Sequence, residues 1–138
     1  MNYQDNFKKA ATLRCEGNTK ESFKEYKKLL KSKDYDLQTE GYHGMALCLK
    51  MDYKIKPAML YYNKGIYLCK KINDESKLVD FYRDIAITYE YFAKYKKAEE
   101  NLKKAIDIAK KLKQTKTNTA KIGITEVKLG VTYLHQKN

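Results

Sequence analysis

The sequence predicts an all-α fold of about seven helices arranged as antiparallel hairpins. Three observations lead to this prediction. The 138-residue chain contains one proline and six glycines, whereas a β-sandwich or barrel needs a turn roughly every ten residues. Apolar residues recur three and four positions apart, which is the spacing of one helix face. The pattern also returns several times along the chain, and repetition on this scale is typical of stacked helical hairpins.

The first helical pair is expected within residues 3–36. Ala10 lies on the apolar side of its first helix, Gly17 supplies the turn, and Tyr26 belongs to the apolar stripe of its second helix. Asn18 stands where the second helix should begin and is a good N-cap residue. The first repeat is therefore a short hairpin.

The second pair is expected within residues 39–72. Ala46 marks the apolar stripe of its first helix, and Ala58 and Tyr62 mark that of its second. Pro57 falls in the first turn of this second helix, where its missing N–H group has no helical acceptor to lose.

The third pair, within residues 79–112, has the clearest helical spacing. Its first helix carries Ala86, its second carries Ala98, and a short break at residues 92–94 separates them. Two helices joined by so short a turn pack antiparallel, and small residues at these positions let the two backbones approach closely.

A last helix is expected over residues 118–136, and it carries two apolar stripes. The preceding hairpin would cover only one of them. We therefore expect the other stripe to form a homodimer or partner interface, because exposed apolar surface of this size favours association. That stripe consists of Ile124, Val127, Val131 and Leu134.

These repeats resemble the tetratricopeptide repeat. The first-helix signature of that family appears as Ile85, Ala86 and Tyr89 and again as Leu129, Gly130 and Tyr133. The small residues of successive repeats are 36, 40 and 44 positions apart, longer than the family's 34. Such stretched repeats resemble the sensor domains of bacterial peptide-pheromone receptors. The resemblance implies one domain over residues 1–138, wound as a short right-handed superhelix.

The resemblance also implies a concave groove that is lined by the first helix of each repeat and that binds peptides. We expect an apolar groove floor flanked mostly by basic side chains, which suits a partner segment with acidic groups and apolar anchors. The residues projected onto the groove are Phe7, Lys8, Ala11, Arg14, His43, Leu47, Lys50, Arg83, Asp84, Ile87, Glu90, Val127, Lys128, Val131 and Leu134.

The charge and the residue composition exclude further classes of function. The net charge is +12, but only two of the 29 basic residues are arginines, and arginine makes most bidentate contacts to nucleic acid. A solvated lysine face is therefore preferred to a nucleic-acid site. The two histidines, His43 and His135, are 92 positions apart, and we find no nucleophile, phosphate-loop or metal-ligand motif. We expect a protein that is not an enzyme and that has no cofactor or metal.

The predicted function is thus a non-enzymatic module for binding proteins or peptides. Two alternatives remain open: a sensor domain for a small signalling peptide, and a basic adaptor for nucleic acid or an anionic surface. The three cysteines form no Cys-x-x-Cys pair, no stretch is apolar enough to span a membrane, and the first residues do not resemble a secretory signal. We therefore expect reduced thiols and a cytoplasmic protein.

Overall fold

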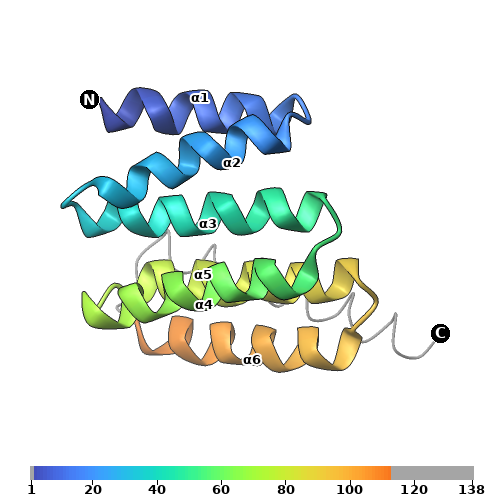
Figure 1. The fold of residues 1–138 in the computed structure, drawn as a ribbon. Coiled ribbons are helices and arrows are strands. Elements are labelled where there is room, and N and C mark those ends of the chain that lie inside the picture. Colours follow the sequence, from blue (N-terminus) through green and yellow to red (C-terminus); the bar gives the residue numbers. More distant parts are fainter. Residues whose placement is uncertain (1, 113–138) are drawn as a thin grey trace. The chain divides into compact units, whose positions relative to one another are not determined.

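The computed structural model describes residues 2–112, and its secondary structure there is entirely helical (Figure 1). The all-α prediction is confirmed, and the expected seventh helix, at residues 118–136, lies outside the described residues. The described residues fall into two compact parts, one ending at Ile72 and the other beginning at Asn73. The elements are α1 (Tyr3–Cys15), α2 (Thr19–Lys28), the 3-10 turn η1 (Leu29–Lys31), α3 (Tyr35–Met51), α4 (Ile55–Lys71), α5 (Glu75–Tyr91) and α6 (Tyr95–Lys111).

Aspartate caps set where α3 and α5 begin. The carboxylate of Asp34 accepts a hydrogen bond from the backbone N–H of Asp36 at 2.9 Å, and that of Asp74 accepts one from Lys77 at 3.0 Å. Each cap satisfies a backbone donor that the first helical turn leaves unpaired. Both helices therefore start about one turn before the repeat boundaries at residues 39 and 79 that the apolar stripes predict.

One turn geometry joins the two helices of each hairpin. Gly17, Tyr53 and Ala93 each adopt a left-handed backbone conformation, with φ of 82°, 60° and 58°. These residues are 36 and 40 positions apart, the same intervals that separate the small residues of the sequence pattern. The backbone N–H of the following residue closes each turn by donating to the carbonyl five residues earlier: Asn18 to Leu13, Lys54 to Leu49 and Lys94 to Tyr89, at 2.9, 2.9 and 2.8 Å. The three hairpin turns therefore share one geometry, at the spacing of the sequence pattern.

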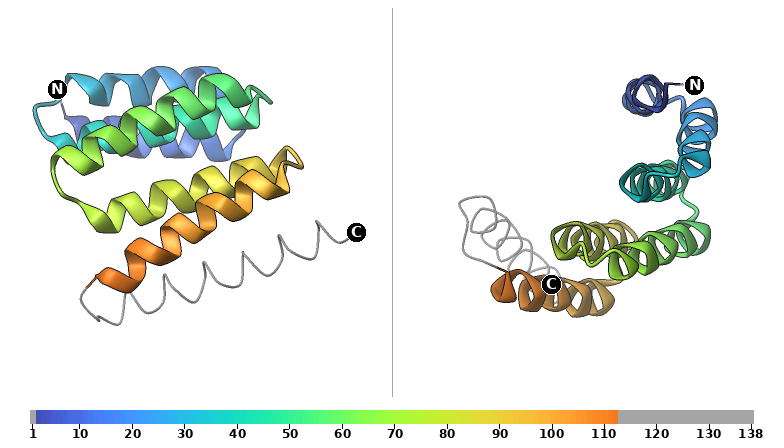
Figure 2. Two further views of the ribbon diagram at one scale, coloured as in Figure 1. Left: turned by 90° about the horizontal axis from the view of Figure 1, so that it is seen from below. Right: turned by 90° about the vertical axis from the view of Figure 1, so that its left-hand side faces the viewer.

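In the first part, α2 contacts both α1 and α3, α1 contacts α3, and α4 packs on α3 (Figure 2). The contact between α2 and α3 depends on two glycines. A Cβ atom on Gly44 would overlap the ring of Tyr26, and one on Gly41 would lie 3.0 Å from the Tyr26 carbonyl oxygen. Helix α3 thus approaches α2 through glycines, and the buried core beside this contact consists of Ala10, Tyr26, Leu29, Met45 and Cys48.

A buried carboxylate ties α1 to α2. Glu25 accepts hydrogen bonds from Asn6 at 3.0 Å and from Lys28 at 2.9 Å, and Lys9 lies 3.6 Å away. The hydrogen bond from Lys28 and, to a lesser extent, that from Asn6 outweigh desolvation and hold the pKa of Glu25 below its usual value. This charge is therefore compensated even though the residue is buried.

The second part is the hairpin of α5 and α6. Ala86 and Ala98 are both buried and belong to one cluster with Leu102, so the small residues do lie at the helix contact as the sequence predicts. Glu99 and Lys103, four positions apart on α6, form an ion pair at 2.9 Å. The pair is partly exposed and supports the helix only modestly.

The cysteines are free thiols. Cys48 and Cys69 are buried, and Cys15 is exposed. Burial raises the pKa of the Cys48 thiol above its usual value, which keeps it protonated near neutral pH. Of the helices that the structure describes, none combines the length and the apolar character that crossing a membrane requires.

Candidate functional site

A hollow of about 190 Å³ lies between α1 and α3 in the first part. The sequence projects five of its lining residues onto the groove, namely Phe7, Ala11, Arg14, His43 and Leu47, and the structure brings all five together. Positions on α1 and α3 thus converge because the two helices are in contact. The complete lining is Phe7, Ala11, Arg14, Tyr26, Glu40, His43, Gly44 and Leu47.

The hollow combines an apolar wall with a fixed cation. Phe7 meets the ring of Tyr26 edge-on, with 6.3 Å between ring centroids. The Nε of Arg14 donates a hydrogen bond to the Tyr26 hydroxyl at 3.2 Å. Although burial opposes the positive charge, the interactions with Tyr26 outweigh it and raise the pKa of Arg14. A hydrogen bond through Nε leaves the two terminal nitrogens of the guanidinium for an acceptor.

His43 is placed by a contact with α4. Its ring centroid lies 6.3 Å from that of Tyr62, whose side chain is fully buried. His43 therefore stands at the edge of the hollow on a rigid support. The second histidine, His135, lies outside the described residues.

A second hollow of about 240 Å³ adjoins the first, and Phe7 and Glu40 line both. Two more carboxylates, those of Asp34 and Asp36, line this neighbour together with Gln4 and Leu37. The rim is therefore mixed rather than mostly basic in this part of the groove: acidic where α1 and α3 begin, and cationic at Arg14 toward their carboxyl ends.

The sequence projection missed Tyr26, Glu40 and Gly44. Glu40 precedes His43 by three residues and Leu47 by seven, so the three share one helix face. The projection took His43 as the first groove residue of this helix. It therefore missed Glu40, one turn earlier, because α3 starts before its apolar stripe does. Tyr26 was interpreted only as a packing residue, and the contact of its hydroxyl with Arg14 is a long-range feature that helical periodicity does not encode.

The other predicted groove residues lie elsewhere. Lys50, on α3, is not part of the lining of either hollow. Arg83, Asp84 and Ile87 lie on α5 in the second part. There the terminal nitrogen of Arg83 is 3.4 Å from Asp80, and its Nε is 4.0 Å from Asp84. Two predicted groove residues, Arg83 and Asp84, thus lie within ion-pair distance of each other.

The remaining predictions concern the C-terminal segment. Lys128 and Val131 of the groove, and the interface formed by Ile124, Val127, Val131 and Leu134, lie outside the described residues. The homodimer therefore stays a prediction. In residues 2–112, no group of three or more His, Cys, Asp or Glu side chains could hold a metal ion.

No protein-family model matches the sequence, and none of the curated proteins compared with it matches either.

Proposed function

We propose that the chain is a non-enzymatic, cytoplasmic binding module of the tetratricopeptide-repeat type, which holds a segment of a partner protein along the face formed by α1 and α3. One observation carries the proposal. Five residues that the repeat pattern assigns to a groove, from two helices and 29 to 40 positions apart in the sequence, line a single hollow.

The chemistry of the hollow defines the segment. Phe7, Ala11 and Leu47 offer apolar contact to one side chain of the partner. Arg14 offers charged donors to a carboxylate or carbonyl. The carboxylates of Asp34, Asp36 and Glu40 in the adjoining hollow favour a positive group beside that anchor. The expected partner is therefore a segment with an apolar anchor and charges of both signs, rather than a uniformly acidic one.

The alternative of a small signalling peptide uses the same surface. Two adjoining hollows of about 190 and 240 Å³ have room for a few side chains, so a free peptide fits as well as a segment of a protein. Comparing the affinity of a selected peptide with that of the same peptide embedded in a longer chain separates the two. Equal affinities favour recognition of the segment alone.

The test is selection of peptides from a random displayed library, followed by affinity measurements on purified variants. Arg14→Ala combined with Leu47→Ala should weaken a selected peptide at least about tenfold, equivalent to about 1.4 kcal/mol. The matched control, Thr12→Ala with Lys27→Ala, also removes one positive charge, but from exposed positions on α1 and α2. An equal loss of peptide affinity in both double variants, or no loss in the Arg14→Ala, Leu47→Ala variant, would refute the proposal.

A further inference from the structure

A larger hollow, of about 410 Å³, lies on the α2 side of the first part. It shares no lining residue with the two hollows between α1 and α3. Its walls come from the start of α2, the end of α3 and the turn that leads into α4. The lining residues are Thr19, Lys20, Phe23, Lys24, Cys48, Leu49, Asp52 and Lys54.

The floor of this hollow is apolar and held in place. The ring of Phe23 packs edge-on against Tyr61 of α4, with 5.8 Å between centroids. The thiol of Cys48 lies 3.4 Å from the hydroxyl of Ser22. Leu49 completes the apolar surface. Because Phe23 and Cys48 already contact other residues of the fold, this apolar surface exists before any ligand binds.

The rim is also fixed at one point. The hydroxyl of Thr19, at the start of α2, donates a hydrogen bond to the carboxylate of Asp52 at 2.7 Å. This bond links α2 to the turn after α3, two segments 33 positions apart in the sequence. The hydrogen bond therefore connects two walls of the hollow directly.

The charge around the mouth is positive. Lys20, Lys24 and Lys54 line it and are exposed. Glu21 lies 3.5 Å from Lys24, while neither Lys20 nor Lys54 has an ion-pair partner among residues 2–112. Three lysines thus face one lining carboxylate, Asp52, which is already a hydrogen-bond acceptor.

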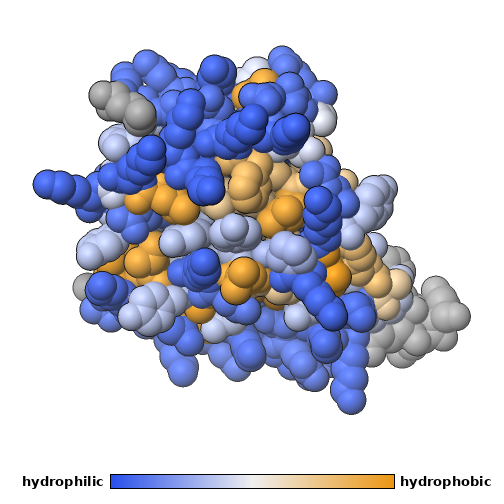
Figure 3. Space-filling model, viewed as in Figure 1, coloured by the Kyte–Doolittle hydropathy of each residue, from blue (hydrophilic) through white to orange (hydrophobic). Residues whose placement is uncertain are grey.

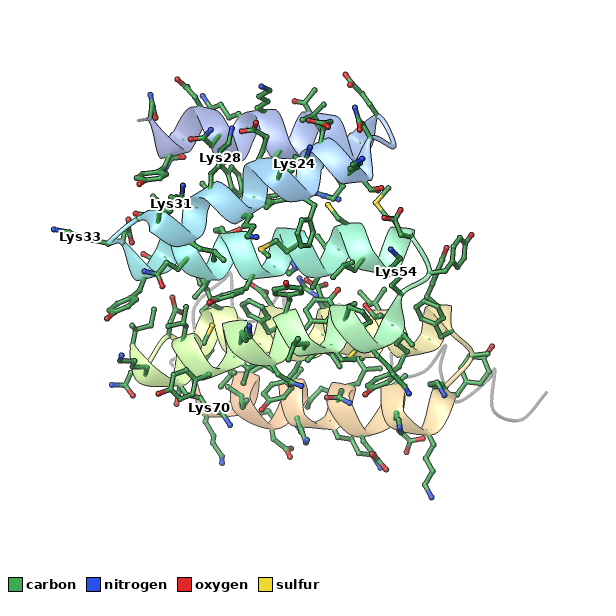
Figure 4. All side chains as sticks on the ribbon, viewed as in Figure 1. Lys24, Lys28, Lys31, Lys33, Lys54 and Lys70 are labelled. Atoms are coloured by element: carbon green, nitrogen blue, oxygen red, sulfur yellow. The ribbon has the colours of Figure 1, made fainter. Side chains whose placement is uncertain are left out.

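The positive surface continues along α2. Figure 4 labels Lys24 and Lys28 on this helix, and Lys31 and Lys33 where the chain leaves it. In Figure 3, hydrophilic groups cover the region of α2, and apolar groups reach the surface in the band below it. Lys28 is paired with the buried Glu25, so the positive charge that extends beyond the hollow comes mainly from Lys31 and Lys33.

We propose that this surface binds an acidic segment of a partner protein, with one bulky apolar side chain seated on Phe23 and Leu49 and its carboxylates against Lys20, Lys24 and Lys54. The apolar floor and the positive rim together match such a segment. Nucleic acid fits less well. The rim has no arginine, and the ring of Phe23 is half-buried against Tyr61, whereas base stacking needs an open ring face.

Three fluorescein-labelled probes test the chemistry by anisotropy at about 0.15 M salt. The first is a short peptide of glutamates with a central pair of leucines, the second has serines in place of the leucines, and the third is an oligothymidylate of equal charge. The leucine peptide should bind at least about tenfold more tightly than either of the others. Equal binding of the two peptides, or tighter binding of the oligothymidylate, would overturn the proposal.

Two charge-reversal variants locate the site. Lys24→Glu with Lys54→Glu should lower the affinity for the leucine peptide at least about tenfold. Lys96→Glu with Lys110→Glu changes the net charge equally, at exposed positions on α6, and should lower it less than about twofold. If both double variants lower the affinity for the leucine peptide equally, the peptide responds only to net charge and no local site exists. Since the two surfaces share no residue, a negative result here leaves the α1–α3 proposal standing.

Discussion

Arg14 and Tyr26 connect the candidate site to the core: the Nε of Arg14 donates a hydrogen bond to the Tyr26 hydroxyl at 3.2 Å, while the Tyr26 ring is buried between α1 and α3. Tyr26 therefore has two roles, one for its ring and one for its hydroxyl group. Its ring fixes how closely the helices approach, and its hydroxyl holds the guanidinium that faces the hollow.

Tyr26→Phe separates these two roles. The ring stays, so the loss in unfolding free energy should be only about 1 kcal/mol, the net worth of one hydrogen bond. Arg14 loses its anchor, so affinity for a peptide selected on the wild type should fall several-fold. Urea unfolding and anisotropy on the same preparation measure both. Unchanged affinity would show that the hydrogen bond does not position Arg14 for binding.

Gly44→Ala tests the close approach of α3 to α2. The added Cβ would overlap the Tyr26 ring, and relieving that overlap should cost about 2–3 kcal/mol. Lys27→Ala, an exposed change on α2, serves as the control and should stay within about 0.5 kcal/mol. A Gly44→Ala protein as stable as the wild type would mean that the two helices lie farther apart than the structure places them.

Two substitutions at the hairpin turns should have opposite effects on stability. Gly17 has φ of 82° and no atom near its missing Cβ, so Gly17→Ala should destabilise by about 1 kcal/mol through the backbone alone. Ala93 has φ of 58° and is exposed, so Ala93→Gly should be neutral or stabilising, by up to about 1 kcal/mol. Thermal unfolding measures both. Shifts of the same sign would contradict the left-handed geometry.

Glu25 should make stability depend on pH. Its pKa is lowered in the folded state, chiefly by Lys28, whereas a glutamate in the unfolded chain titrates near about 4.3. The stabilisation is therefore complete above about 4.3 and is lost as the pH falls through the lower folded value. Glu25→Gln should cost about 1–2 kcal/mol at neutral pH, and that difference should shrink as the pH falls below about 4.3. A difference independent of pH would contradict the ion pair.

Local features of the sequence predicted a large part of this structure. Alanines at helical spacing, such as Ala46, Ala86 and Ala98, are buried at helix contacts, and Gly17 stands at a turn that requires positive φ. Helical period and turn chemistry encode both kinds of feature because they depend only on neighbouring residues.

The rest depends on residues far apart in the sequence. The start of α3 at Asp34 is set by a side-chain cap outside the apolar stripe, and the stripe alone placed the boundary too late. Two contacts form only where one hairpin packs against the next. They are the close approach of Gly44 to Tyr26 and the hydrogen bond between Thr19 and Asp52. For this reason neither the acidic end of the α1–α3 face nor the hollow beside α2 could be predicted from helical periodicity.

The most direct test of the central claim, that the α1–α3 face binds the partner segment, is a two-dimensional NMR titration of the full chain with a peptide selected from the library. We predict that the largest amide shift changes fall on Phe7, Ala11 and Arg14 of α1 and on residues 40–47 of α3, with the second part changing little. Largest changes at residues 19–24 and 49–54, or on α6, would contradict the assignment of the binding face.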